Sequence, residues 1–145
     1  MCPSSSASVI IKSASRAKSD GPQPLARIVS WGIVGLEPAI MAYGPVPSSR
    51  KALEKAGMTV DDIDLWNINE TFAGQAVACS KYLGINVEKV NINGGGGWTW
   101  PSSCCSGTRL ILTLALELKR RGGQYGIATA CIDGGQGIAL IIESI

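Results

Sequence analysis

The sequence predicts an α/β layered domain, with a mixed β-sheet and helices packed on it. Two observations carry this prediction. Short apolar runs alternate with stretches of helical periodicity, and the chain closes with two apolar runs joined by a glycine-rich turn. Alternating strands and helices favour parallel pairing, whereas a closing hairpin is antiparallel, so the sheet should be mixed. At 145 residues the chain is long enough to bury a real core.

The N-terminal stretch is basic, serine-rich and free of acidic residues until Asp20. Residues 7–12 (ASVIIK) are rich in apolar side chains and predict a strand, and residues 14–18 predict a helical turn. The same composition also suits a weak transit peptide, and that alternative stays open. A loop at 21–24, with the sequence GPQP, separates this stretch from the rest of the chain.

The next elements are a strand and a short helix. Residues 25–32 (LARIVSWG) predict the strand, and residues 38–47 are loop-like, with a glycine-proline turn signal. Ser48 or Ser49 can cap the start of the helix, and Gly57 can end it. Its buried stripe should consist of Ala52, Leu53 and Ala56.

A short strand at 64–68 leads into a second helix. Asn69 and Glu70 are expected to open this helix, which should run to about Leu83. One face should carry the apolar side chains of Phe72, Ala73, Ala76 and Val77. Residues 90–93 (VNIN) predict a further strand, which ends in a run of four glycines.

The clearest helical pattern covers 106–121, where leucine and isoleucine recur at helical spacing. Three basic residues occupy its last turn, where the helix dipole favours cations, and Gly122 follows as a stop signal. Residues 125–131 and 137–144 predict the last two strands, joined by the tight turn 133–137.

Composition excludes several classes of protein. The net charge is +2 and the basic residues are scattered, so no nucleic-acid-binding surface is expected. The five cysteines are odd in number and lack CxxC spacing, and histidine is absent. This pattern argues against a disulfide framework and a metal site and favours a reducing compartment. No apolar run reaches membrane-spanning length, so no membrane partner is expected.

Three segments can carry chemistry, and each also has a plain structural explanation. Asn69-Glu70-Thr71-Phe72 follows a strand directly, so Asn69 can hold a water or ligand at the sheet edge, or simply cap a helix. Asn93 precedes four glycines and Trp98-Thr99-Trp100-Pro101. That run permits close backbone approach to a ligand or forms a flexible loop.

The third segment is Cys131-Ile132-Asp133-Gly134-Gly135-Gln136-Gly137. A thiol at a strand end, facing a turn rich in backbone N–H groups, can be a reactive group. A cysteine on a strand can equally be a small buried apolar side chain.

Together these segments resemble the thiolase family. Asn-Glu-x-Phe after a strand, Asn-Gly-Gly at a strand end and Cys-x-x-Gly-Gly-x-Gly near the C-terminus occur in the family's order and spacing, as do ARIVSWG and GPVPSSRKALEKAG. The resemblance covers residues 25–144. It implies that residues 25–145 form the thiolase C-terminal domain, one half of the thiolase fold. Residues 1–24 then resemble an eroded remnant of the end of the N-terminal domain.

Thiolases transfer acyl groups between coenzyme A and the enzyme, cleaving 3-ketoacyl-CoA or condensing acetyl-CoA. The resemblance implies that Asn69 positions a water beside the substrate thioester oxygen. It implies that Cys131 moves a proton at the substrate's α-carbon, as general acid and base. The backbone N–H of Asp133 falls where the family has an oxyanion-hole donor. The coenzyme A thioester is the substrate, and no cofactor is implied.

The sequence departs from the family pattern at three points. The family's catalytic histidine, in a Gly-His-Pro motif, falls on Pro101, which has no titratable group. Asp133 brings a carboxylate close to a developing oxyanion, which it repels. The family's N-terminal half, with its acylated cysteine and most coenzyme A contacts, lies outside this sequence.

The stretch around Pro101 suggests its own origin. Residues 100–104 can be encoded so that a one-base shift yields Gly-His-Pro-Leu at the matching position, and the family pattern resumes at Cys105. We infer a pair of compensating frameshifts, with an independently diverged loop as the alternative. On the frameshift hypothesis the loop 94–105, with Trp98 and Trp100, should be the least ordered internal segment.

The leading expectation is a thiolase C-terminal domain of an acyl-CoA acyltransferase, inactive as this isolated chain. The alternative is a non-catalytic fragment or pseudoenzyme that acts as a binding or structural module. The expected partners are acyl-CoA and a thiolase N-terminal half or subunit, and the family implies a homo-oligomer. The expected compartment is the cytoplasm, or the mitochondrion or peroxisome in a eukaryote.

Overall fold

A computed structural model describes residues 6–21, 23–94 and 105–145 of the chain. Its elements, in chain order, are α1 (Ala14–Ser19), β1 (Ala26–Gly35), the 3₁₀ helix η1 (Pro38–Tyr43), α2 (Pro45–Ala56), β2 (Leu65–Ile68), α3 (Ala73–Leu83), the 3₁₀ helix η2 (Val87–Lys89), α4 (Ser106–Arg121), β3 (Tyr125–Ile132) and β4 (Gln136–Ser144).

The four strands form one mixed sheet in the order β1-β4-β3-β2. β2 runs parallel to β3, whereas β4 is antiparallel to both β3 and β1, which confirms the mixed sheet that the sequence predicts. The strand expected at 90–93 is wrong: it is reduced to one parallel bridge between Val90 and Trp66. Asn91 has a φ of +48°, and this left-handed backbone turns the chain out of the extended conformation.

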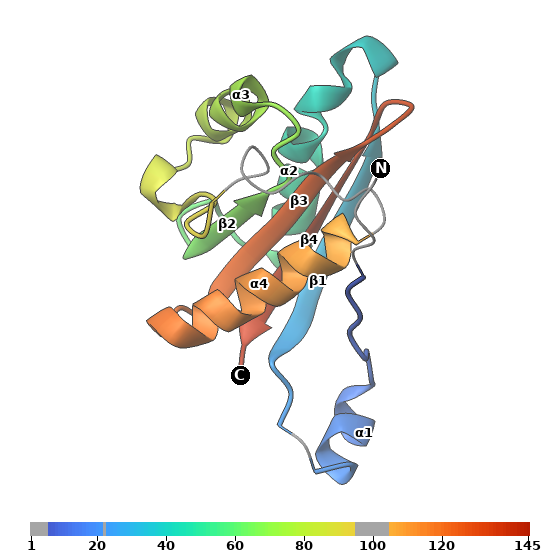
Figure 1. Ribbon diagram of the computed structural model, residues 1–145, viewed down its shortest axis with the longest axis vertical. Helices are drawn as coiled ribbons and strands as arrows, with labels where there is room; N and C mark the ends of the chain where they lie inside the picture. Colours follow the sequence, from blue (N-terminus) through green and yellow to red (C-terminus); the bar gives the residue numbers. More distant parts are fainter. Residues whose placement is uncertain (1–5, 22, 95–104) are drawn as a thin grey trace.

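Helices cover both faces of the sheet (Figure 1). On one face, α2 and α3 pack over a core that includes Trp66, Ile127 and Ile141. On the other face, α4 packs Leu114 and Leu118 against β2, β3 and β4. α4 has the bounds predicted from its periodicity, and Gly122 ends it in the left-handed conformation. The apolar stripe of this helix therefore decides which of its sides faces the sheet.

α2 begins three residues before the predicted start. Pro45 occupies its first turn and Gly44 is its N-cap residue, so the loop expected up to residue 47 is wrong. Proline suits the first turn of a helix because its missing N–H would have no partner there. Ser48 is therefore a buried residue inside the helix, and its Oγ donates to the Gly44 carbonyl oxygen at 2.9 Å. The predicted end at Gly57 is confirmed, with a φ of +66°.

α3 begins at Ala73, four residues later than predicted. The backbone N–H of Asn69 still donates to the Thr129 carbonyl oxygen at 2.8 Å, so the β2–β3 pairing continues past the end of β2 and delays the helix. The expected apolar face is also wrong, since the Phe72 side chain is 68% exposed and Val77 is 55% exposed. The residues that face the core are Gln75, Cys79, Ser80 and Leu83.

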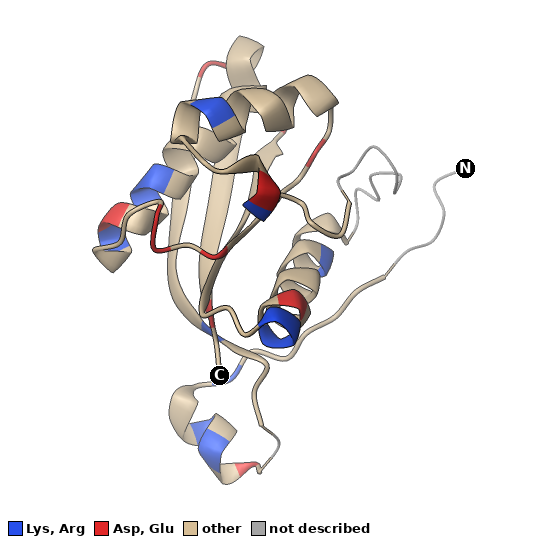
Figure 2. Cartoon of the chain, turned by 90° about the vertical axis from the view of Figure 1, so that its left-hand side faces the viewer, with Lys and Arg blue, Asp and Glu red and all other residues tan. Residues whose placement is uncertain are grey.

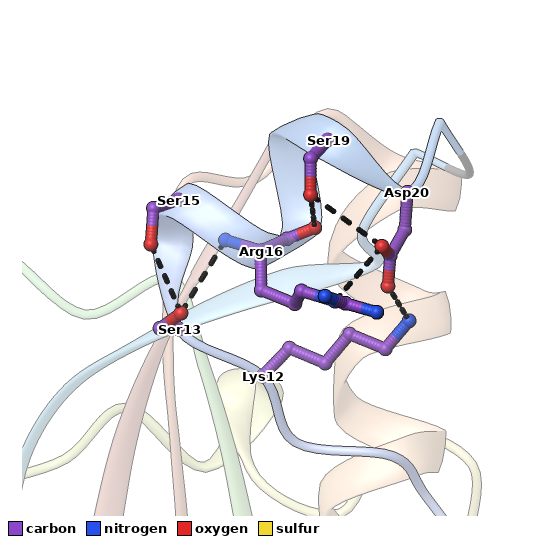
Figure 3. Close-up of polar contacts among 6 residues, drawn as sticks. All are labelled: Lys12, Ser13, Ser15, Arg16, Ser19 and Asp20. Atoms are coloured by element: carbon purple, nitrogen blue, oxygen red, sulfur yellow. Dashed lines mark hydrogen bonds and ion pairs between the residues drawn. The ribbon is translucent and has the colours of Figure 1, made fainter.

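The N-terminal segment lies apart from the sheet (Figure 1). The helical turn predicted at 14–18 is confirmed as α1, but the strand expected at 7–12 is wrong, because this segment pairs with no strand among the described residues. Lys12 and Arg16 both form ion pairs with Asp20, at 2.5 and 3.0 Å (Figure 3). No residue of α1 is buried, so local contacts of this kind hold the segment. That residues 1–24 are a domain remnant stays a prediction.

β1 is one of the two edge strands of the sheet, and two lysines of α2 cover it. Lys51 Nζ donates to the Ile33 carbonyl oxygen at 2.9 Å, and Lys55 Nζ donates to that of Trp31 at 3.0 Å. Four residues rise about 6 Å along a helix, and two residues span about 6.6 Å along a strand, so the two spacings match. These lysines occupy carbonyls that an edge strand would otherwise offer to another chain.

Acidic and basic residues lie close together on α4, and others are spread along the rest of the chain (Figure 2). Among the described residues, no helix is both long enough and apolar enough to cross a membrane.

Candidate functional site

Cys131 lies at the carboxyl end of β3, opposite Gly137 of β4. It follows Ile127 and Thr129 on the same strand face, the face covered by α2 and α3. Its sulfur lies 3.7 Å from Thr71 Oγ1, in the segment between β2 and α3. The half-buried thiol is therefore held at a sheet end where two distant parts of the sequence meet.

Asn69 lies at the same sheet end, one residue beyond β2. Its half-buried side chain lines a cavity of about 160 Å³ between the end of β2, residues 91–94 and α4. Within the described part of the chain, the side-chain carboxamide of Asn69 makes no hydrogen bond. Its NH₂ donor and its oxygen acceptor are therefore both available to a ligand or water.

The structure therefore brings the segments of Asn69 and Cys131 to the same end of the sheet, as the sequence predicts. It does not join the two side chains directly, because Asn69 lines the cavity on the α4 side and Cys131 contacts the segment that leads into α3. That both side chains act on one substrate stays a prediction.

The backbone conformation of the turn after Cys131 requires glycine. Gly134 and Gly135 have φ values of +79° and +83°, which other residues rarely adopt. The Gly134 N–H donates to Asp133 Oδ1 at 2.9 Å, so the carboxylate of Asp133 occupies a backbone donor of this turn. The proposed oxyanion role belongs to the N–H of Asp133 itself, and it stays a prediction.

Two residues that the sequence did not single out surround Cys131. Thr71 supplies the contact to its sulfur, and Cys79 lies buried on α3. Burial, and to a smaller extent the neighbouring Cys131, raise the pKa of the Cys79 thiol to about 11. Cys79 is therefore a neutral thiol near pH 7. Of these two residues, only Thr71 could have been found from the sequence, because it stands inside the Asn-Glu-x-Phe motif.

The charged side of the cavity is organised by Glu117 of α4. Its carboxylate accepts hydrogen bonds from the Arg120 and Arg121 guanidinium groups and from the Asn93 side chain, and these contacts lower the pKa of Glu117 to about 2. Asn93, from the predicted Asn-Gly-Gly motif, is thereby tied to α4. Its plain role here is to hold residues 91–94 against the helix.

Pro101, the position of the family histidine, lies outside the described residues, as do Trp98 and Trp100. The expectations for the loop 94–105 therefore stay predictions. In the described ranges, no group of three or more acidic, cysteine or histidine residues is arranged to hold a metal ion.

The fold defines an α/β domain in which a cysteine near the end of β3 and an asparagine just beyond β2 lie at the same end of the sheet. The family model described as "Thiolase, C-terminal domain" matches residues 22–144, so the chain belongs to the thiolase family. The resemblance expected from the three motifs is thereby confirmed.

Several relatives are similar over nearly the whole chain. Acetyl-CoA acetyltransferase of Syntrophomonas wolfei is 47% identical over 96% of this chain, and that of Shinella zoogloeoides is 48% identical over 96%. Each match spans 36% of the relative. The chain therefore spans about a third of the length of these curated relatives.

Solved structures give the same result. Human mitochondrial 3-ketoacyl-CoA thiolase in complex with CoA superposes with a TM-score of 0.89 and 44% identity, over 91% of this chain and 34% of the human chain. The Bacillus anthracis acetyl-CoA acetyltransferase superposes with a TM-score of 0.89 and 47% identity, over 92% of this chain and 34% of its own.

Proposed function

We propose that this chain supplies the C-terminal half of an acyltransferase site that acts on acyl-coenzyme A, with Cys131 as the proton-transfer group and Asn69 as the water-holding group. The observation that supports it best is the meeting of the two motif segments at one sheet end, through the contact of Thr71 with Cys131. The relatives named as acetyl-CoA acetyltransferases support the same substrate class.

On this proposal, a thiolase N-terminal half completes the site and the coenzyme A thioester is the substrate, without a further cofactor. The 145-residue polypeptide taken alone is inactive, because the acylated nucleophile of the family comes from the other half. The proposed compartment is one that holds acyl-coenzyme A: the cytoplasm, or the mitochondrion or peroxisome of a eukaryote.

A non-catalytic role is the second candidate, and one observation favours it. The chain contains no histidine, and Pro101 stands where the family has its catalytic one. Losing one member of a catalytic unit removes several orders of magnitude in rate. A chain of this kind can keep the fold and serve as a binding module.

A chimera separates the two candidates. The C-terminal domain of the Bacillus anthracis acetyl-CoA acetyltransferase is replaced by this chain, and coenzyme A-dependent cleavage of acetoacetyl-CoA is measured. We expect no activity until residues 100–104 are changed to Gly-His-Pro-Leu-Gly, and activity in the changed chimera that C131S abolishes. A soluble, changed chimera that stays inactive would favour the non-catalytic role.

A further inference from the structure

The segment between β2 and α3 crosses the end of β3. The N–H of Asn69 donates to the Thr129 carbonyl oxygen at 2.8 Å, and the chain does not enter α3 until Ala73. This stretch carries Thr71 to Cys131, where Oγ1 and Sγ lie 3.7 Å apart. In the described part of the chain, this is the one side-chain hydrogen bond to the Cys131 sulfur.

A hydroxyl group suits a sulfur that changes its protonation state. The Thr71 hydroxyl can accept a hydrogen bond from a thiol S–H, and after rotation it can donate one to a thiolate. The second bond is the stronger one, because its acceptor is charged. Thr71 is exposed and lies outside α3, so its hydroxyl is free to rotate without breaking a helical contact.

The titratable groups described around this sheet end include three acids, a thiol and Arg109, which lines the cavity with Asn69 on the α4 side. Glu70 Oε2 lies 3.5 Å from Asn91 Nδ2, and Asp133 Oδ1 accepts from the Gly134 N–H. Glu37 precedes η1, and Cys79 is a buried thiol on α3. Arg109 lies with Asn69 on the α4 side, whereas Thr71 contacts the sulfur itself, so Thr71 is the side-chain donor placed beside a negatively charged sulfur.

We propose that Thr71 is a positioning residue for Cys131: it holds the sulfur at the sheet end, and its hydroxyl donates a hydrogen bond to that sulfur whenever the sulfur is deprotonated. The role of Cys131 in proton transfer rests on the proposed function. The contact with Thr71 acts on the sulfur whether or not the chain completes an acyltransferase site.

The proposal is tested by alkylation of the full 145-residue chain with iodoacetamide, followed by trypsin and mass spectrometry. Cleavage after Arg121 leaves peptide 122–145, in which Cys131 is the only cysteine, and peptide 56–81 contains Cys79 alone. The rate at each cysteine is therefore measured separately, in wild type, T71V and T71S, over a range of pH.

We expect T71V to slow alkylation of Cys131 by about threefold or more near pH 7, because the attacking thiolate loses a hydrogen-bond donor. T71S should restore the wild-type rate, because it keeps the hydroxyl. The difference should shrink as the pH rises to about 10, where free thiols are deprotonated in any variant.

T59V is the matched control, because it removes a threonine hydroxyl that instead bonds Asp62 in the loop before β2. It should leave Cys131 alkylation unchanged. Equal rates and equal pH profiles for T71V and wild type would overturn the proposal. So would slowing by T71S as large as that by T71V, or a matching change in alkylation at Cys79, since either result indicates a packing effect.

A different result would contradict the proposed function. If the chimera stays inactive while Cys131 alkylation still follows the Thr71 hydroxyl, the positioning role holds and the acyltransferase role does not.

Discussion

Gly137 and Gly44 lie in direct backbone contact, so that a Cβ atom on Gly137 would be 2.2 Å from the Gly44 carbonyl oxygen. Gly137 is the last glycine of the motif that follows Cys131, and Gly44 is the N-cap residue of α2. The motif therefore has a structural task, because it lets β4 pass the start of α2.

Substitution G137A should destabilise the domain by about 2 kcal/mol or more, because the overlapping atoms are backbone and cannot rotate away. Urea unfolding monitored by circular dichroism measures the loss. G107A is the matched control: Gly107 lies in α4, nothing is within 4 Å of its added Cβ, and alanine favours the helix by about 0.5–1 kcal/mol. Equal midpoints for the two variants would contradict the close approach.

Two leucines on α4 separate the packed side from the exposed side. Leu118 is fully buried against the sheet, and the Leu116 side chain is 50% exposed. L118A should cost about 2–5 kcal/mol through lost burial and a cavity, whereas L116A should cost less than about 1 kcal/mol. The same unfolding experiment checks both. A large loss of unfolding free energy for L116A and a small one for L118A would indicate that α4 turns its other side toward the sheet.

Lys51 and Lys55 should keep the β1 edge from pairing with another chain. The double variant K51A/K55A frees the carbonyl groups of Trp31 and Ile33 and leaves these two exposed apolar side chains beside an open edge. We expect concentration-dependent association in sedimentation velocity that exceeds that of wild type. K81A, on the exposed side of α3, is the control for losing a positive charge. Equal association in both variants would show that the edge is closed by other means.

Glu117 should make the stability of the fold depend on pH in the acidic range. Its folded-state pKa is lowered to about 2 from an ordinary value of 4.5, chiefly by the Arg120 and Arg121 contacts. A lowered pKa stabilises the fold above the unfolded value, and that contribution disappears as the pH falls from about 4.5 to about 2. The unfolding midpoint of E117Q should therefore lie below that of wild type at pH 7 and approach it near pH 2.

The exposed Glu88 supplies the comparison for this prediction. E88Q removes a carboxylate of the same kind from the surface, and its unfolding midpoint at pH 7 should stay close to that of wild type. A midpoint difference between E117Q and wild type that is the same at both pH values would contradict the ion-pair explanation.

Periodicity alone determined the elements with strong local patterns. The leucine spacing of 106–121 predicted α4 with its bounds, and the glycine-rich turn before residue 137 predicted the closing hairpin. Glycines 57, 84 and 122 end helices in the left-handed conformation, a preference that belongs to the residue itself. The three motifs were also sufficient to indicate the family, since their order and spacing are properties of the sequence.

Tertiary structure decided what depends on distant partners. Asn69 and Glu70 have the composition of a helix start, but the backbone of β3 offers Asn69 a hydrogen bond and keeps it extended. Phe72 and Val77 are apolar yet exposed, because α3 turns Gln75 and Cys79 toward η1, where both bond the Ala42 carbonyl oxygen. The contact of Thr71 with Cys131 joins residues 60 positions apart. Local preference is shared by many conformations, and only the pairing of such distant groups selects one of them.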